Sequence, residues 1–375
     1  MKISPIVDAD GHIVEPADLW EKYTEGKFRD EAPRIVIDNK GKQRWMIAGR
    51  LFHVPEGKAC GFPGGERLEQ RPKGAFDGKV RLQDMDRDGI DIAVVFPTAA
   101  SLVRGANSAR AEAAYVRAYN NWLKDYCSAD PSRLKGVAVI PMRDVEEAVS
   151  EIERVAKFGN FVGMVIPGLT DDKHLDDPSF GPMWAAAQAA DLTVSIHAAT
   201  GLPPIVPVTE RFDNFFLTHM FSHPVAQMIA IATIFAGGVL DKYQKLKFVF
   251  LESGIGWVPW WIERLDEHYE KLPHLVPNAK RMPREHLKGP RIYYSCDPDE
   301  TSLPDAFSQL GDDRIVYASD YPHWDMRPAS VKMIKDRSDI SEAQKKKLFT
   351  ENPLALFSRI TSDQKTVVKE KAASA

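Results

Sequence analysis

Eight short apolar runs recur along the chain, and stretches with apolar residues at helical spacing lie between them. The runs are rich in β-branched residues and apolar at consecutive positions, which is typical of parallel strands covered on both faces. Eight strands alternating with helices predict an α/β fold of the (β/α)8 TIM-barrel type, and the competing fold is a doubly wound open sheet. The runs span residues 3–10, 90–97, 134–141, 161–167, 192–197, 246–252, 291–296 and 314–320.

Amphipathic stretches predict the helices that connect these strands. Asp144 is expected to cap one helix, because its carboxylate accepts hydrogen bonds from the free N–H groups of a first turn. Pro224 is expected to open another helix, which places His223 just before a helix start. The predicted helices span residues 106–127, 145–157, 179–190, 224–236 and 256–270.

Two insertions interrupt the alternation, after strands one and five, and distort the expected barrel. Residues 40–80 are rich in Gly, Pro and charge and contain a candidate hairpin, QRWMIAGRLFHV, while residues 201–220 form the second insertion. Both follow strand ends on the face where barrel active sites lie, so the first is expected to be a lid or a dimer arm. We predict a single barrel domain over residues 1–360 and a flexible polar tail over 361–375.

Composition and charge narrow the class of protein. The chain has 49 Lys and Arg against 53 Asp and Glu, a net charge of −4, which argues against nucleic-acid binding. No uncharged apolar stretch approaches the roughly 20 residues of a membrane span, so no membrane partner is expected. The 3 cysteines do not form a disulfide framework, and the expected location is a reducing cytoplasm.

Several of the predicted strands end in residues that bind metals. Asp10 and His12 end the first run, His197 the fifth, Glu252 the sixth and Asp320 the eighth. Residues two apart on a strand point to the same side, so Asp10 and His12 both face the barrel mouth. Carboxylates and imidazoles at the ends of buried runs need compensation, and a divalent cation provides it.

The motifs around these positions resemble the amidohydrolase-2 group of the amidohydrolase superfamily, which contains metal-dependent hydrolases and decarboxylases. The resemblance covers the chain from Val7 to about Phe357. It rests on DADGHIVEP at the start, RLQDMDRDGID at 81–91, GGVLDKYQKLKFVFLESGIGWVPWWIERLD at 237–266 and ASDYPHWD at 318–325.

This resemblance implies a distorted barrel that binds one divalent metal ion through Asp10, His12, His197 and Asp320. Zn²⁺ is the expected ion, and Mn²⁺ and Fe²⁺ also suit these ligands. Many decarboxylases of the family have a histidine where this chain has Glu252, which favours a hydrolase or lyase in which Glu252 binds metal, orients water or holds a histidine. No lysine ends the fourth run, so the carbamylated-lysine bridge of dinuclear members is not expected.

We therefore predict a metal-dependent hydrolase that cleaves a C–N, C–O or C–S acyl bond of a small organic or aromatic acid derivative with metal-activated water. Asp320 is the expected general acid and base. His223 or His197 is expected to stabilise the oxyanion, and Glu252 to orient water or a histidine. His323 is expected to orient the loop after Asp320.

Two other functions stay open at this stage. The first is non-oxidative decarboxylation of an aromatic or enoic acid, in which Asp320 protonates carbon and Arg104, Arg211 or Arg327 anchors the carboxylate. The second is a binding protein that keeps the barrel without turnover. The expected partners are a small-molecule substrate and a second copy of the chain in a homodimer.

Overall fold

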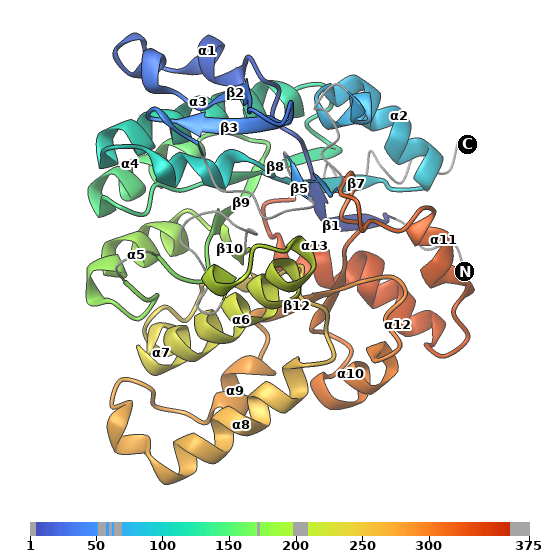
Figure 1. Cartoon of the computed structure of the whole chain (residues 1–375). Coiled ribbons are helices and arrows are strands. Elements are labelled where there is room, and N and C mark those ends of the chain that lie inside the picture. Colours follow the sequence, from blue (N-terminus) through green and yellow to red (C-terminus); the bar gives the residue numbers. More distant parts are fainter. Residues whose placement is uncertain are drawn as a thin grey trace.

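The computed structural model describes residues 5–51, 58–59, 62–63, 70–170, 173–197 and 209–360. Eight parallel strands form one sheet and run in chain order around it (Figure 1). The strands are β1 (Val7–His12), β7 (Ile92–Phe96), β8 (Leu134–Val139), β9 (Phe161–Ile166), β10 (Thr193–Ile196), β11 (Phe248–Phe250), β12 (Ile292–Cys296) and β13 (Ile315–Tyr317).

Backbone hydrogen bonds join the first strand to the segment that follows the last one. The N–H of His12 donates to the carbonyl of Tyr321 at 2.5 Å, and the N–H of Asp320 donates to the carbonyl of Asp10 at 3.0 Å. An open doubly wound sheet keeps its edge strands apart, so this closure identifies the fold as the predicted (β/α)8 barrel.

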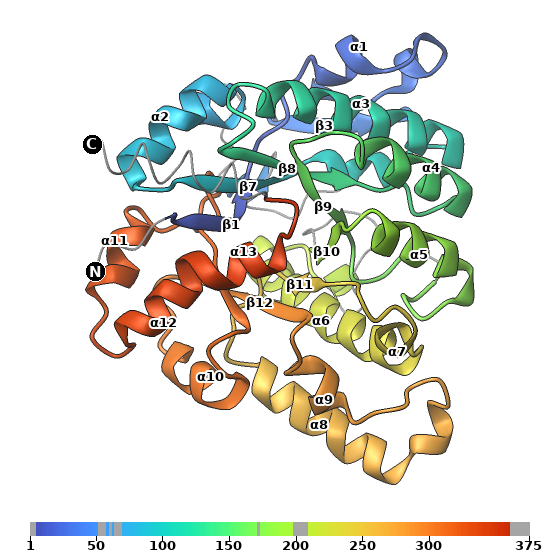
Figure 2. The same ribbon diagram turned by 180° about the vertical axis from the view of Figure 1, so that it is seen from behind.

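Helices surround the sheet, and the last helices cover one end of the barrel. The predicted N-cap is confirmed, because the Asp144 carboxylate accepts from the N–H groups of Glu146 and Glu147. Figure 2, which views the molecule from behind, shows the C-terminal helices crossing the barrel. The surrounding helices include α2 (Gly78–Asp88), α3 (Ala109–Cys127), α4 (Val145–Val155), α5 (Gly181–Ala189), α6 (Phe215–Ala236), α8 (Val258–Lys271), α10 (Leu303–Leu310), α11 (Ser330–Asp336), α12 (Glu342–Lys346) and α13 (Asn352–Leu356).

The predicted hairpin in the first insertion is confirmed. It is formed by β3 (Gln43–Ile47) and β4 (Arg50–Leu51), and Ala48 and Gly49 turn the chain with φ of 50° and 75°. Two positive φ values are what a tight two-residue turn requires. The small sheet begins earlier than expected, with β2 (Arg34–Ile37) paired to β3. The described residues do not include most of 52–69, residues 201–208 of the second insertion, or the tail 361–375. The lid or dimer arm and the flexible tail therefore stay predictions.

The expected start of α6 at Pro224 is wrong, because the helix already begins at Phe215. The Asn214 side chain caps it by accepting the N–H of Leu217, and Pro224 lies inside the helix. Proline disfavours a helix interior but removes only one backbone donor there. The expectation that no uncharged apolar stretch approaches the length of a membrane span is also wrong, because α6 has 22 residues and fits one by length and composition. Here, however, the Gln227 amide donates to the carbonyls of Ile196 and Leu251, which fixes α6 against two strand ends.

Candidate metal centre

The first strand brings Asp10 and His12 to the mouth through a local irregularity. The pairing of β1 with β7 shifts register between Asp8 and Gly11. A Cβ atom on Gly11 would lie 2.5 Å from Asp8 Oδ2 and 2.6 Å from Arg81 Nη2, so only glycine fits here. Asp8 is fully buried, and Ser319 Oγ donates to its carboxylate at 2.6 Å.

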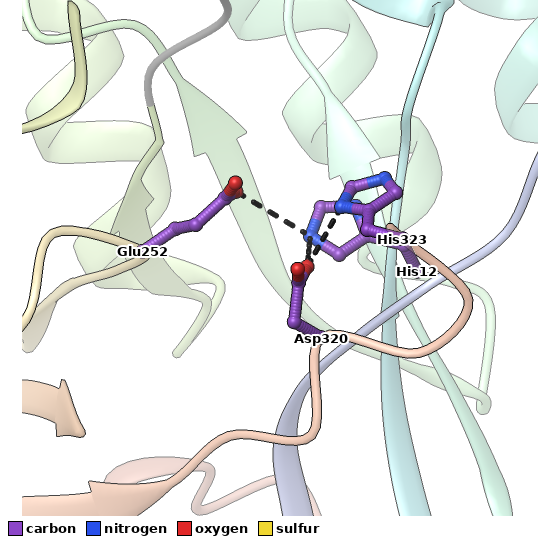
Figure 3. Close-up of side chains that lie close together, drawn as sticks. All are labelled: His12, Glu252, Asp320 and His323. Carbon is purple, nitrogen blue, oxygen red and sulfur yellow. Dashed lines mark hydrogen bonds and ion pairs between the residues drawn. The ribbon is translucent and has the colours of Figure 1, made fainter. Parts of the chain in front are cut away.

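Two of the candidate residues stand in the left-handed region of backbone space. Glu252 follows β11 with a φ of 51°, and Asp320 follows β13 with a φ of 54°. Such a conformation costs a residue with a Cβ about 1–2 kcal/mol and persists where the surrounding structure enforces it. In both cases the turn directs a carboxylate toward His12 (Figure 3).

The four predicted metal ligands and Glu252 form two overlapping groups that share His12. His12 Nε2 lies 3.3 Å from Asp10 Oδ1, 3.6 Å from Asp320 Oδ1 and 3.9 Å from Glu252 Oε2. His197 Nε2 lies 2.9 Å from Glu252 Oε2 and 4.0 Å from Asp10 Oδ1. The sequence therefore identified residues from four strands that do lie together, which permits a shared ligand.

The hydrogen bonds of His12 show that these atoms fit a cation. His12 Nδ1 lies 2.9 Å from the carbonyl of Pro97, which only accepts, so Nδ1 carries the hydrogen. Burial, reinforced by nearby His197, lowers the pKa of His12 to about 3, so its ring is neutral and Nε2 carries a lone pair. That buried lone pair faces carboxylate oxygens without a hydrogen-bond partner among the described residues. A divalent cation between them would replace repulsion with coordination.

The carboxylates of the centre have divergent pKa values. Burial raises the pKa of Asp10 to about 7. Burial also raises the pKa of Asp320 well above its usual range, and Glu252 adds to this effect. Burial alone would raise the pKa of Glu252 too, but His223 and His197 lower it well below its usual range. These directions favour the charged form of Glu252 and the protonated form of Asp320.

A chain of hydrogen-bond contacts links Asp320 to His323 and Thr98. The Thr98 hydroxyl donates to the carbonyl of Ile13 at 2.5 Å, so at 2.9 Å it accepts a hydrogen from His323 Nε2. His323 Nδ1 lies 2.7 Å from Asp320 Oδ1, and this contact needs one hydrogen, on the ring or on the carboxyl group. His323 thus orients Asp320 directly, as well as the loop.

Sequence reasoning missed two members of the site, His219 and Asp325. His219 Nε2 lies 3.9 Å from Glu252 Oε1 and 3.8 Å from Asp325 Oδ2, and His223 Nε2 lies 3.5 Å from Glu252 Oε1. The available signal was the spacing of His219 and His223, four residues apart, which puts both on one helix face. The expected helix start at Pro224 concealed that spacing.

A cavity of about 390 Å³ opens over the centre among the described residues. Asp320, Glu252 and His223 line it, and so does Arg327, whose guanidinium contacts Asp299 at 2.6 Å. Of the three arginines proposed as carboxylate anchors, Arg327 is the one that the described lining includes. A small organic acid would fit this volume.

Comparison with known proteins gives one family and a consistent set of relatives. A family model described as amidohydrolase matches residues 7–359. A γ-resorcylate decarboxylase from Polaromonas sp. is 27% identical over 75% of this chain and 86% of its own length. A 2-amino-3-carboxymuconate-6-semialdehyde decarboxylase from Dictyostelium discoideum is 25% identical over 93% of this chain and 90% of its own.

A solved structure has the same fold. The 5-carboxyvanillate decarboxylase from Novosphingobium aromaticivorans, which contains manganese, has a TM-score of 0.72 at 22% identity and covers 94% of this chain and 97% of its own.

These relatives overturn the predicted hydrolase. Both curated relatives are decarboxylases, so the expectation of acyl-bond hydrolysis is wrong and the alternative reaction is the supported one. The error has a physical cause. The same carboxylate and imidazole donors hold a cation for either reaction, so Glu252 in place of a histidine does not by itself distinguish hydrolysis from decarboxylation.

Proposed function

The chain belongs to the amidohydrolase family and is a metal-dependent enzyme, and from that premise we propose that it removes CO₂ without oxidation from an aromatic or enoic carboxylic acid. Decarboxylation replaces a carbon–carboxylate bond with a carbon–hydrogen bond. The enzyme must therefore bind an anion, protonate a carbon atom and let CO₂ leave.

The observation that carries the proposal is the placement of Asp320. It lines the cavity, adopts left-handed backbone geometry and shares one hydrogen with His323 at 2.7 Å. In the proposed reaction Asp320 gives this proton to the carbon that bears the carboxylate. The bond to the carboxyl carbon then breaks, its electron pair returns to the substrate, and CO₂ departs. His323 and solvent return a proton to Asp320.

Asp10, His12, His197 and Asp320 are the residues that would hold the metal ion. When bound, a divalent cation would supply Lewis acidity toward the substrate's oxygen atoms. Two imidazoles with two carboxylates suit Zn²⁺, the ion expected from the sequence, and Mn²⁺, the ion in the related carboxyvanillate decarboxylase. Restoring stripped protein with each ion separately distinguishes them.

Other residues position the reactants. Arg327 presents a guanidinium to the cavity, where it would pair with a carboxylate of the substrate. Glu252 holds His197 through a 2.9 Å contact, and His223 faces the other oxygen of Glu252. We assign catalytic proton transfer to Asp320, and positioning to Glu252 and His223.

A substrate screen tests the proposal. Chelated protein, restored with Zn²⁺ or Mn²⁺, is incubated with hydroxylated benzoates and enoic acids, and CO₂ release is measured against a metal-free control. We expect metal-dependent CO₂ release from at least one acid, with one proton taken up for each CO₂. Metal-loaded, folded protein that releases no CO₂ from any of them would overturn the proposal.

The cytoplasmic location and the homodimer expected from the sequence are part of this proposal. Cys127 and Cys296 are buried free thiols, which suits a reducing compartment. Sedimentation of the purified protein measures the oligomeric state directly.

A further inference from the structure

A buried ion pair adjoins the part of β1 that carries Asp10 and His12. Asp8 and Arg81 are 0% and 1% exposed, and Arg81 Nη2 lies 3.8 Å from Asp8 Oδ2. Asp8 belongs to none of the groups of candidate ligand atoms among the described residues. We propose that Asp8 and Arg81 are positioning residues, which fix the two segments of chain that carry three of the four metal ligands. The inference rests on the metal centre assigned above and adds residues that bind no metal themselves.

The Asp8 carboxylate joins the first strand to the segment that follows the last one. Its Oδ1 accepts the N–H of Asp10 at 3.3 Å and the N–H of Ser319 at 3.0 Å. Its Oδ2 accepts the Ser319 hydroxyl at 2.6 Å. Asp10 is an assigned metal ligand, and Ser319 immediately precedes Asp320, another one. One carboxylate therefore holds together the backbone positions that carry two of the ligands.

The Arg81 guanidinium, on α2, contacts the same two segments. Its Nη1 donates to the carbonyl of His12 at 3.2 Å, and its central carbon lies 3.8 Å from the centre of the Tyr321 ring. A cation over an aromatic face is an attractive contact. Tyr321 follows Asp320, and the Tyr321 carbonyl accepts the N–H of His12. Arg81 thus contacts the backbone of one ligand and the residue next to another.

The space around Gly11 shows how closely the pair packs against the strand. A Cβ atom there would lie 2.5 Å from Asp8 Oδ2 and 2.6 Å from Arg81 Nη2, so the two charged groups occupy the volume that a side chain between the ligands would fill. The pairing of β1 with β7 is irregular between Asp8 and Gly11. Where regular strand pairing is interrupted, side-chain contacts have to fix the backbone in its place.

The energetics of a buried ion pair favour a positioning role over a purely stabilising one. Removing two charges from water costs about as much free energy as their attraction returns, so apolar side chains would stabilise the fold at least as well. Apolar side chains would not, however, make directed hydrogen bonds to the backbone of Asp10 and His12. Contacts of this type orient metal ligands, and their loss typically weakens metal binding by about 10–100-fold.

The metal affinity of the folded protein tests the inference without any substrate, so its outcome does not depend on the decarboxylase proposal. The variant is Arg81→Met, which keeps an apolar stem and removes the guanidinium. We expect its dissociation constant for Zn²⁺, measured in competition with a chromophoric chelator, to rise by about 10–100-fold over that of the wild type. Circular dichroism and urea unfolding identify the conditions in which both proteins are folded.

The matched control is Arg133→Met, which changes another mostly buried arginine at the amino ends of the strands. Arg133 donates to the carbonyls of Ile90 and Asp91 at 2.9 Å and to the Asp86 carboxylate at 2.7 Å. We expect this variant to unfold at a lower urea concentration but to bind Zn²⁺ within about twofold of the wild type. A purely structural Arg81 would give the same result, so wild-type zinc affinity in Arg81→Met would overturn the inference.

Two milder variants keep the test decisive if Arg81→Met does not fold. Arg81→Lys keeps the charge but loses the planar fork, so its zinc affinity should lie between those of Arg81→Met and wild type. Ser319→Ala removes one hydrogen bond to Asp8 and should weaken zinc binding by about tenfold.

The visible spectrum of the Co²⁺ form provides a second measurement on these variants, because it responds to the geometry of the ligands. We expect it to change in Arg81→Lys and Ser319→Ala and to stay unchanged in Arg133→Met. Wild-type zinc affinity with an unchanged cobalt spectrum in the two milder variants would overturn the positioning role. Folded wild type that binds no zinc would overturn the metal centre itself, and this inference with it.

Discussion

Polar groups at the two ends of the barrel differ in whether they are hydrogen-bonded. At the amino ends of the strands, arginines pair with carbonyl oxygens of the same chain. Arg359 donates to the carbonyls of Phe161, Ala156 and Ala190 at 2.7–3.0 Å, and Arg291 donates to those of Leu240, Tyr243 and Leu246. At the carboxyl ends, lone pairs and carboxylates face one another instead.

This difference separates stability from chemistry. The carbonyls at the amino ends terminate helices and begin strands, and a guanidinium satisfies several of them at once. At the carboxyl ends, His12 Nε2 and Asp10 Oδ1 are buried without a hydrogen-bond partner among the described residues, and Glu252 and Asp320 hold left-handed backbone geometry. One end is arranged to close the fold, and the other is arranged to receive a charged ligand.

The largest expected effect is the loss of activity in Asp320→Asn. An amide does not supply the carboxyl proton, so we expect kcat to fall by about 10²–10⁴. The matched control is Asp313→Asn, which changes an exposed residue at the amino end of the same strand and leaves kcat within about twofold. Equal loss in both variants, or normal turnover in Asp320→Asn, would remove the distinction between the two ends.

The next effect is on metal affinity. His12→Gln keeps a polar side chain but removes the lone pair at Nε2, so we expect the dissociation constant for Zn²⁺ to rise by at least about 100-fold. Competition with a chromophoric chelator measures it, and circular dichroism checks the fold. Unchanged affinity would show that the ion does not lie among these atoms.

At the amino end we expect a substitution to lower the free energy of unfolding without changing the zinc content. Arg359→Met retains the apolar stem and leaves three carbonyls without their donor, so the free energy of unfolding should fall by about 1–3 kcal/mol. Denaturant unfolding measures this change, while zinc content and kcat serve as internal controls. A variant with normal stability but reduced zinc content would reverse the assignment of the two ends.

The sequence was sufficient to predict the barrel and the part of the site that contains Asp10, His12, His197 and Asp320. Parallel strands leave long apolar runs, and Asp10, His12, His197 and Asp320 stand where such runs end, so pattern and chain order brought them together. The positive φ of Glu252 and Asp320 was not predictable, because it accompanies hydrogen bonds to distant residues: the Asp320 N–H donates to the carbonyl of Asp10, and the Glu252 N–H donates to the Ser295 hydroxyl. His219 was not predicted, because Pro224 indicated a helix start and so placed His219 outside the expected helix.

Predicting the reaction required information that the local sequence pattern does not contain. Acyl cleavage and decarboxylation use the same donors, and they differ in how the substrate's carboxylate is held. We propose that this contact involves Arg327, which lies two residues beyond the end of the motif ASDYPHWD and is brought to the cavity by the folded loop. The relatives, which are decarboxylases, indicated the type of reaction, whereas the spacing of the site residues did not.

The smallest predicted effect is a difference in how the two ends respond to pH. Glu15 lies under the mouth and accepts the N–H groups of Thr98, Ala99 and Ala100, and burial raises its pKa to about 7. The folded protein therefore keeps a proton that the unfolded chain loses near its ordinary value of 4.5, so rising pH favours unfolding between these values. A single group changes the free energy of unfolding by at most about 1.4 kcal/mol for each pH unit.

We therefore expect metal-free protein to lose stability from about pH 5 to about pH 7, and Glu15→Gln, which does not ionise, to lose less. Arg359→Met should lower stability by the same amount at both pH values, because the guanidinium stays charged throughout. Urea unfolding of the three proteins at each pH measures the slopes. Parallel slopes in wild type and Glu15→Gln would show that the buried carboxyl under the mouth is already ionised, and hence that the mouth accommodates charge without a bound cation.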